Sequence, residues 1–240
     1  MFDNIAGDYD SLNHILSLDI DKIWRKKALK QILDAPDPVQ ILDLACGTGD
    51  FSIGIARSLA KRNNCQTKKD NISTCSHITG VDLSEGMLAV MREKVGKAGL
   101  TELISIEEGD GENLRFQDNS FDRVTIAFGI RNFENRPKGL KEMLRVLKPG
   151  GRLVILELSR PENPVIRWIY DLYFLHILPW IGGKVSGDKA SYAYLPASVA
   201  AFPGKKEFAA TMRAAGFGNV THKAFTLGIC RMYTGEKQNG

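Results

Sequence analysis

The sequence predicts an α/β fold: a mostly parallel, seven-stranded sheet with helices on both faces, an antiparallel last strand and a helical lid. Short apolar runs alternate with amphipathic stretches between residues 39 and 158, and this alternation is typical of βαβ units and a parallel sheet. A glycine-rich loop joins the first apolar run to the first amphipathic stretch. Near the end of the chain, residues 220–224 and 229–234 look like a closing antiparallel pair of strands.

The parallel part of the sheet is expected to have five strands, at residues 39–44, 77–82, 103–107, 121–128 and 152–158. Helices are expected at residues 50–61, 84–99, 137–147 and 205–215. In the first helix, Phe51, Ile55 and Leu59 follow one another at helical spacing and form an apolar face. Ser84 has the chemistry of an N-cap for the second helix, and Pro137 suits the first turn of the third.

All 240 residues are expected to form a single domain with four parts. Residues 1–36 are expected to form an N-terminal helical lid and residues 39–158 the ligand-binding core. Residues 160–204 are expected to be an insertion with substrate-binding and lid residues, and residues 205–240 a C-terminal helix and β-hairpin. Residues 61–76 are polar, basic and without periodicity, which is typical of a solvated surface loop.

The composition is that of a soluble globular protein, with 43% apolar and 25% charged residues. A net charge of +4 spread along the chain does not favour a nucleic-acid partner. The four cysteines form no CxxC pair and no zinc-ligand spacing, so no metal is expected. The N-terminus resembles neither a secretory signal nor a transit peptide, and we therefore expect a cytoplasmic protein.

The strongest functional signal is the glycine-rich loop between the first strand and the first helix. At Gly47, Thr48 and Gly49 the backbone can turn tightly and approach a ligand at the carboxyl edge of the predicted sheet. A tight turn without a ligand is one alternative. A dinucleotide site is another, but its third glycine is displaced to Gly54, and Asp50 would repel a pyrophosphate at the helix N-terminus.

Two acids beside this loop favour a ligand with a positive charge. Asp43 lies four residues before the first glycine, and Asp82 ends the second strand. S-adenosylmethionine fits this pattern, because it carries a sulfonium and an ammonium group and no phosphate. We expect Asp43 to hold the cationic end, directly or through water, and Asp82 to accept hydrogen bonds from the ribose hydroxyls.

These motifs resemble those of the class I S-adenosylmethionine-dependent methyltransferases, which have a Rossmann-like fold. The loop reads LDLACGTGD, and VDLSEGML, EEGDGENLRF, SFDRV and LKPGGRL follow it in the family's order. The resemblance implies S-adenosylmethionine as the cofactor and Asp82 as the ribose acid. It also implies that Asp110 and Gly111 bind the adenine edge, with Leu114 nearby.

Further segments resemble the ubiquinone/menaquinone biosynthesis C-methyltransferase family. They are MFDNIAGDYDSLNHILSLDIDKIWRKK, FGIRN at residues 128–132, YDLYFLHILPWIGG and GDKASYAYLPASVAAFP. The resemblance implies methylation of a ring carbon of a prenylated quinol in menaquinone biosynthesis, ubiquinone biosynthesis or both. Demethylmenaquinol is favoured because the chain shows no mitochondrial presequence. Ala127 stands where the family usually has serine, so it is not counted as a side-chain ligand.

The chemistry requires a nucleophilic ring carbon, which forms when the neighbouring hydroxyl loses its proton. Arg131 and Asn132 follow the fourth strand at its carboxyl end. Arginine stays protonated, so Arg131 is expected to stabilise the phenolate, the alternative being a surface salt bridge. Asn132 is expected to hold a water or a ring oxygen. The base is expected in the lid segments, where the candidates are Asp188, Tyr192, His176, Tyr9 and Asp10.

Asp188 and Tyr192 are favoured among these, because they are four residues apart and would share a helical face. The alternative role for each candidate is a structural hydrogen bond. The pocket wall is expected to include residues near the N-terminus, namely Tyr9, Asn13, Trp24 and Arg25.

The longest apolar stretch, residues 165–181, is interrupted by charges and a proline and is too short to span a bilayer. It is expected to be either a buried helix or a helix that lines an apolar pocket or lies on a membrane surface. In the second case it forms the route for the prenyl tail and contacts the inner face of the membrane loosely. The apolar residues available for this are Trp168, Ile169, Leu172, Tyr173, Leu175, Ile177, Leu178 and Trp180. A homodimer is left open.

The competing functions are methyl transfer to acceptors other than a quinol. Amino-methylating enzymes of nucleic acids or proteins carry an NPPY-like motif after the fourth strand, whereas this chain has FGIRN there. Cytosine C5 methylation requires a nucleophilic cysteine at that end, and none of the four cysteines fits. A methyltransferase for another small molecule and a non-catalytic cofactor-binding module remain as alternatives.

Overall fold

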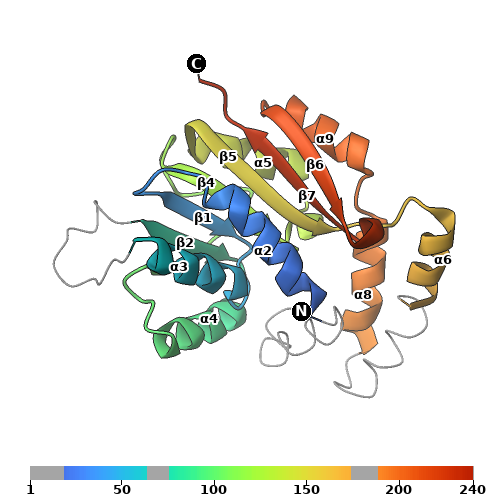
Figure 1. The fold of residues 1–240 in the computed structure, drawn as a ribbon, viewed down its shortest axis with the longest axis horizontal. Helices are drawn as coiled ribbons and strands as arrows, with labels where there is room; N and C mark the ends of the chain where they lie inside the picture. Colours follow the sequence, from blue (N-terminus) through green and yellow to red (C-terminus); the bar gives the residue numbers. More distant parts are fainter. Residues whose placement is uncertain (1–18, 64–75, 174–188, 240) are drawn as a thin grey trace.

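The computed structural model describes residues 19–63, 76–173 and 189–239. Its centre is one seven-stranded sheet with the strand order β3-β2-β1-β4-β5-β7-β6 (Figure 1). The strands are β1 (Gln40–Leu44), β2 (His77–Asp82), β3 (Ile104–Glu108), β4 (Phe121–Ala127), β5 (Leu147–Leu158), β6 (Gly218–Phe225) and β7 (Cys230–Glu236). Strands β1 to β5 pair in parallel, and β7 pairs antiparallel with both β5 and β6. The predicted sheet with its antiparallel last strand is confirmed.

The described helices follow the predicted order. They are α2 (Ile20–Ile32), α3 (Asp50–Asn63), α4 (Glu85–Lys97), α5 (Arg136–Val146), α6 (Pro164–Leu172), α8 (Lys189–Ala200) and α9 (Lys205–Ala214), with short 3₁₀ helices η3 (Ile130–Asn132) and η5 (Thr226–Gly228). The side chain of Ser84 accepts a hydrogen bond from the backbone N–H of Met87 at 3.3 Å, which confirms its prediction as an N-cap.

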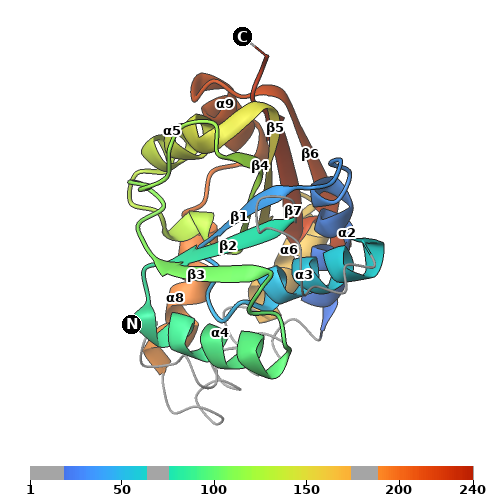
Figure 2. The same ribbon diagram turned by 90° about the vertical axis from the view of Figure 1, so that its left-hand side faces the viewer.

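Helices cover both faces of the sheet and create two apolar cores. One core joins the sheet to α2, α3 and α4, with Ile55 and Leu59 fully or almost fully buried. The other joins it to α5 and α9 through residues such as Met143 and Phe208. Figure 2 shows α2 and α3 on one side of the sheet and α5 and α9 on the other. Strands covered in this way are apolar on both faces, which is why they appear as short apolar runs in the sequence.

Strand β5 begins at Leu147, five residues before the predicted start. The segment Lys148-Pro-Gly-Gly151 has the composition of a turn, yet it continues the strand. The pairing with β4 is irregular there, because Phe121 opposes Leu147 while Arg123 opposes Arg152. A bulge of this kind accommodates extra residues in one strand without ending it.

Two segments predicted to form the lid differ in their surroundings. The last turns of α2 belong to the core, where Ala28 and Ile32 are fully buried. Helix α6 is mostly exposed and lies beyond the end of β5 (Figure 1). Within the described ranges, no helix has the length and apolarity that crossing a bilayer demands.

Candidate active site

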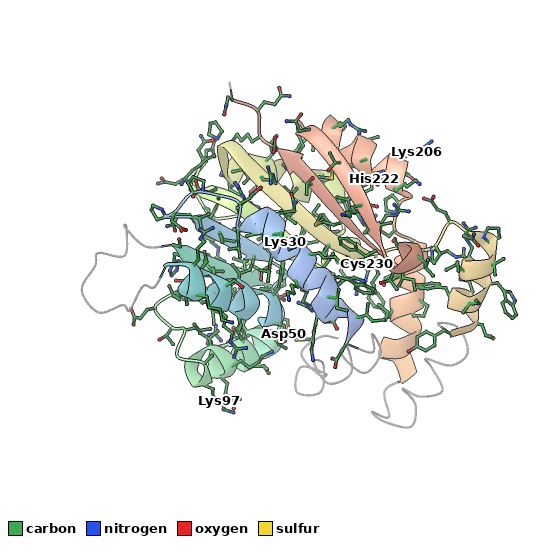
Figure 3. The ribbon with its side chains drawn as sticks, in the orientation of Figure 1. Lys30, Asp50, Lys97, Lys206, His222 and Cys230 are labelled. Atoms are coloured by element: carbon green, nitrogen blue, oxygen red, sulfur yellow. The ribbon has the colours of Figure 1, made fainter. Side chains whose placement is uncertain are left out.

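A cavity of about 870 Å³ lies at the carboxyl edge of the parallel strands, where ligands bind in open α/β sheets. Its walls come from the glycine loop, the turns after β2, β3 and β4, the first turns of α2, and α6 with η5. In the view of Figure 3, Asp50 and Cys230 lie on either side of the first turns of α2. The volume is within the range of ~300–1,000 Å³ typical of small-molecule sites. One end of the cavity is lined by carboxylates and by the backbone of the glycine loop, and the other end is lined mostly by apolar side chains.

Asp82 is held at the cavity wall by two backbone donors. The N–H of Gly47 donates to Oδ2 and the N–H of Ser84 donates to Oδ1, both at 2.9 Å. These bonds fix the carboxylate between the glycine loop and the start of α4. A carboxylate has further lone pairs, so Asp82 can still accept hydrogen bonds from two ribose hydroxyls.

The glycine loop is shaped by close packing on α4. Gly49 has a φ of +83°, and a Cβ at this position would lie 2.5 Å from Cγ of Met91. Gly47 has a φ of +56°, with open space where a Cβ would lie. Gly47 and Thr48 line the cavity, whereas Gly49 is not part of its wall and packs against Met91 of α4.

Asp43 lies behind the loop and is only 1% exposed. Its Oδ2 accepts a hydrogen bond from the hydroxyl of Ser52 at 2.5 Å, and its Oδ1 has no partner among the described residues. Burial raises the pKa of Asp43 to about 7. A buried carboxylate with an unused oxygen suits a nearby cation. Because Asp43 is not part of the cavity wall, contact through water fits it better than direct contact.

The turn after β3, predicted to bind the adenine edge, has a close contact that only glycine allows. Asp110 Oδ1 accepts a hydrogen bond from the N–H of Glu112 at 2.8 Å, which orders the turn after β3. A Cβ on Gly111 would lie 2.6 Å from Cζ of Phe133. The absence of this atom lets the Phe133 ring pack against the backbone of the turn. The unpartnered oxygen of Asp43 and the ordered turn that lines the cavity at Asp110 fit a cationic nucleoside.

Arg131 lies in the cavity wall and pairs with a buried acid. Its Nη1 lies 2.8 Å from Oε1 of Glu157, whose side chain has no exposed surface. The backbone N–H of Arg131 donates to Oε2 of Glu157 at 3.1 Å, and its Nε donates to the hydroxyl of Ser198 at 3.3 Å. The expected alternative of a surface salt bridge is therefore wrong, because this ion pair is buried. Asn132 Oδ1 accepts a hydrogen bond from the hydroxyl of Tyr194 at 2.9 Å.

Glu157 was not predicted from the sequence as the partner of Arg131. A signal was present, because Glu157 is the one acid in the apolar run of β5 from Leu153 to Leu158. A charge in a strand buried on both faces needs a partner.

The candidates for the base lie mostly outside the described part of the chain. Asp188, His176, Tyr9 and Asp10 lie outside the described residues, as does the wall candidate Asn13. Tyr192 belongs to α8, but its side chain is outside the description. Their roles stay predictions.

The apolar end of the cavity is lined by one face of α6. Ile169 and Tyr173 line it as expected, and so do Ile166 and Tyr170, which the sequence analysis did not name. By contrast, Trp168 is 67% exposed and is not part of the wall. Residues 165–181 were expected to form either a buried helix or a helix that lines an apolar pocket or lies on a membrane surface. The described part, residues 165–173, is an exposed helix with one face in the pocket wall. Leu175, Ile177, Leu178 and Trp180 lie outside the described residues.

Strained backbone gathers around the cavity. Ala45, Phe128, Thr226 and Leu227 have φ values of 49°, 63°, 45° and 56°, and all four line the cavity. Non-glycine residues persist in this region only where the surrounding structure holds them, often at functional sites. Trp24 contributes to this restraint, because its Nε1 donates to Oγ1 of Thr226 at 2.8 Å and joins α2 to η5. No local sequence motif marks η5.

Comparison with known proteins identifies the family. A model of the ubiE/COQ5 methyltransferase family matches residues 1–237. The chain belongs to this family. It is 45% identical to a demethylmenaquinone methyltransferase from Bacteroides fragilis over 237 residues, covering 99% of this chain and 91% of that protein. It is 46% identical to a ubiquinone/menaquinone biosynthesis C-methyltransferase UbiE from Geotalea daltonii, covering 99% and 94% of the two chains.

Solved structures agree on the fold. An S-adenosylmethionine-dependent methyltransferase from Thermotoga maritima aligns with a TM-score of 0.63 and 18% identity, covering 99% of this chain and 98% of that one. Membership of the ubiE/COQ5 methyltransferase family confirms the predicted enzyme class and its cofactor, S-adenosylmethionine. In the described part of the chain, no cluster of three or more histidine, cysteine or acidic side chains is placed to bind a metal ion.

Proposed function

We propose that this ubiE/COQ5-family enzyme methylates a ring carbon of a prenylated quinol, with demethylmenaquinol as the preferred acceptor. The observation that carries this proposal is the two-ended cavity, in which a carboxylate-rich end continues into an apolar end lined by α6. A polar ring attached to an isoprenoid tail has the same two-ended character. The relatives named for demethylmenaquinone methylation support the acceptor.

When bound, S-adenosylmethionine would supply an activated methyl group to the ring carbon, leaving as the thioether, and the ring carbon would give up its own hydrogen as a proton. Asp82 and the turn at Asp110 orient the nucleoside, and Asp43 offsets its positive charge. Asn132, on the turn after β4, holds a water or a ring oxygen of the acceptor. Arg131 contributes positive charge on the acceptor side, although Glu157 balances much of it. The apolar wall excludes water and so strengthens these polar interactions.

The test is methyl transfer from a deuterated donor to two reduced quinols with the same short prenyl tail, one a naphthoquinol and one a benzoquinol. Mass spectrometry of the products should show a ring methyl group, formed faster on the naphthoquinol. Asp82→Ala should lose cofactor affinity, whereas Glu93→Gln, on the exposed face of α4, should match the wild type. Methylation of neither quinol would refute the function, and a faster benzoquinol reaction would refute the preference.

We also propose that the exposed face of α6 rests on the inner surface of the cytoplasmic membrane. Val165 and Trp168 are 66% and 67% exposed, and Leu172 is 43% exposed. This apolar face continues into the cavity through Ile169, which is itself 53% exposed and lines the wall. The bilayer is the favoured occupant, because a prenylated acceptor resides there and its tail could enter along α6.

Flotation with liposomes tests this contact. Each exposed side chain should contribute roughly 1–2 kcal/mol on insertion, since burial of a whole apolar side chain is worth about 1.5–3 kcal/mol. Val165→Ser with Trp168→Ser should reduce the bound fraction at least tenfold, whereas Ile23→Ser, an exposed control on α2, should not. Equal flotation of all variants would overturn the proposal. Sedimentation that shows a dimer lost only in the double variant would instead assign this face to a second copy of the chain.

A further inference from the structure

Two arginines, Arg25 and Arg131, line the described part of the cavity. Developing negative charge on a ring oxygen is best stabilised by a cation whose charge is not already neutralised. The Arg131 guanidinium pairs with buried Glu157 at 2.8 Å and also donates to the backbone carbonyl of Phe128. Much of its charge is therefore used in holding the turn after β4.

Arg25 makes fewer and longer polar contacts than Arg131. Its Nε lies 3.3 Å from Oδ2 of Asp21, one turn earlier on α2, which is long for a charged hydrogen bond. Its guanidinium carbon lies 5.3 Å from the ring centroid of Phe128. No other hydrogen bond of Arg25 occurs within the described residues, and its side chain is 20% exposed. An arginine has five N–H donors, so its terminal nitrogens remain available.

The neighbours of Arg25 fix its position. The preceding residue, Trp24, is anchored to Thr226 through its indole N–H. The Trp24 ring also lies 6.2 Å from the Phe128 ring, centroid to centroid. Phe128 has a left-handed backbone with a φ of 63°. Arg25 thus extends from a restrained helix over a restrained aromatic ring, and such a preorganised charge costs little reorganisation during reaction.

The charge of Arg25 acts on two buried groups near the cavity. Burial raises the pKa of Asp43, at the end of β1, and of Cys230, at the start of β7, and the Arg25 charge partly offsets both shifts. The positive charge of Arg25 therefore acts both near the glycine loop, through Asp43, and beside η5, through Cys230. Within the described ranges, the charged or titratable groups that interact with Arg25 are Asp21 on α2, Asp43 and Cys230.

We propose that Arg25 is a further catalytic residue that hydrogen-bonds a ring oxygen of the acceptor and stabilises its phenolate form. This inference depends on the proposed function, because it requires an acceptor with a phenolic hydroxyl. Burial in an apolar cavity raises the pKa of a phenol, and a cation within hydrogen-bonding distance lowers it again. Arg131 then supports the turn, and Arg25, whose pair with Asp21 is longer and involves only Nε, supplies charge through its terminal nitrogens.

The experiment is a spectroscopic titration of a prenylated nitrophenol bound together with S-adenosylhomocysteine, since nitrophenolate absorbs visibly and its ionisation is read without turnover. The wild type should bind the ionised form, and Arg25→Gln should shift the apparent pKa of the bound probe upward, with at least tenfold weaker binding of the phenolate at neutral pH. Arg25→Lys should lie between them. Lys26→Gln, exposed on the same helix, is the control and should match the wild type.

Turnover gives an independent readout. Arg25→Gln should lower kcat by about 10²-fold, in the range for loss of one preorganised donor, with the KM for S-adenosylmethionine unchanged. The defect should shrink as the pH rises, because hydroxide then ionises the acceptor without Arg25. A purely structural role would give a defect independent of pH.

An unshifted probe pKa in Arg25→Gln, or a pH-independent defect, would overturn the inference. If Arg25→Gln does not fold, the shift in Arg25→Lys decides the question in the same way. A wild-type protein that methylates no quinol would refute the proposed function. A wild type that methylates quinols while Arg25→Gln equals it would refute only the role of Arg25.

Discussion

Replacement of Asp43 by asparagine should remove a pH dependence that this buried acid imposes on the stability of the ligand-free protein. Burial raises the pKa of Asp43 from 3.8 to about 7. Between these values the folded state keeps the proton and the unfolded state loses it, so stability falls as the pH rises. At 1.36 kcal/mol per pKa unit, a shift of about 3 units corresponds to about 4 kcal/mol. The loss is complete above pH 7.

Urea unfolding between pH 4 and 8 measures this effect. Asparagine resembles the protonated acid, so Asp43→Asn and the wild type should differ little near pH 4. The variant should become the more stable of the two as the pH rises, by up to about 4 kcal/mol. Acids with lowered pKa values contribute equally to both proteins and cancel in the difference. Glu108→Gln, an exposed control, should show no such trend. A difference between Asp43→Asn and the wild type that stays constant across the pH range would refute the reasoning.

The same acid should connect cofactor binding to proton release. A cationic ligand favours the ionised form of Asp43, which is about half protonated near pH 7, so binding there should release up to about half a proton. Calorimetry of S-adenosylmethionine binding in two buffers with different ionisation enthalpies measures that proton. Asp43→Asn should abolish the release and weaken binding, and an unchanged release would contradict the assignment.

Two further predictions concern the loop and the buried ion pair. Gly49→Ala should cost about 1–3 kcal/mol of stability and weaken cofactor binding, because the added Cβ is strained and meets a side chain of α4. Gly54→Ala, where nothing lies within 4 Å of the added Cβ, should be neutral or stabilising in the same thermal melts. Glu157→Leu should cost about 3–5 kcal/mol by leaving Arg131 buried without its partner. The double variant Arg131→Met/Glu157→Leu should recover most of this loss in urea unfolding, and simple additivity would show that the pair is not coupled.

The fold was predictable because its signals are local. Each strand buried on both faces is an apolar run, and the helices between them carry caps and apolar faces at helical spacing. The early start of β5 was not predictable, since Lys148-Pro-Gly-Gly151 has turn chemistry and only its pairing with β4 keeps it in the strand. A register shift is a tertiary property that composition does not encode.

The site also has features that the local sequence predicts and features that depend on tertiary contacts. Asp82 and the glycine loop could be predicted because both lie at strand ends that a parallel sheet brings to one edge. The contact from Trp24 to Thr226 joins residues 202 positions apart, and no local pattern reveals it. For α6, the sequence showed its apolar character but not which residues face the cavity, because that depends on the packing of the helix against the rest of the molecule. The apolar wall therefore came only partly from the predicted residues.

A crystal structure of the protein with S-adenosylhomocysteine and a short-chain demethylmenaquinol would test the central claim most directly. The account predicts the ribose hydroxyls on Asp82, the quinol ring between the thioether sulfur and the first turns of α2, and the tail along α6. A quinol bound elsewhere on the molecule, or a nucleoside that does not contact Asp82, would contradict it.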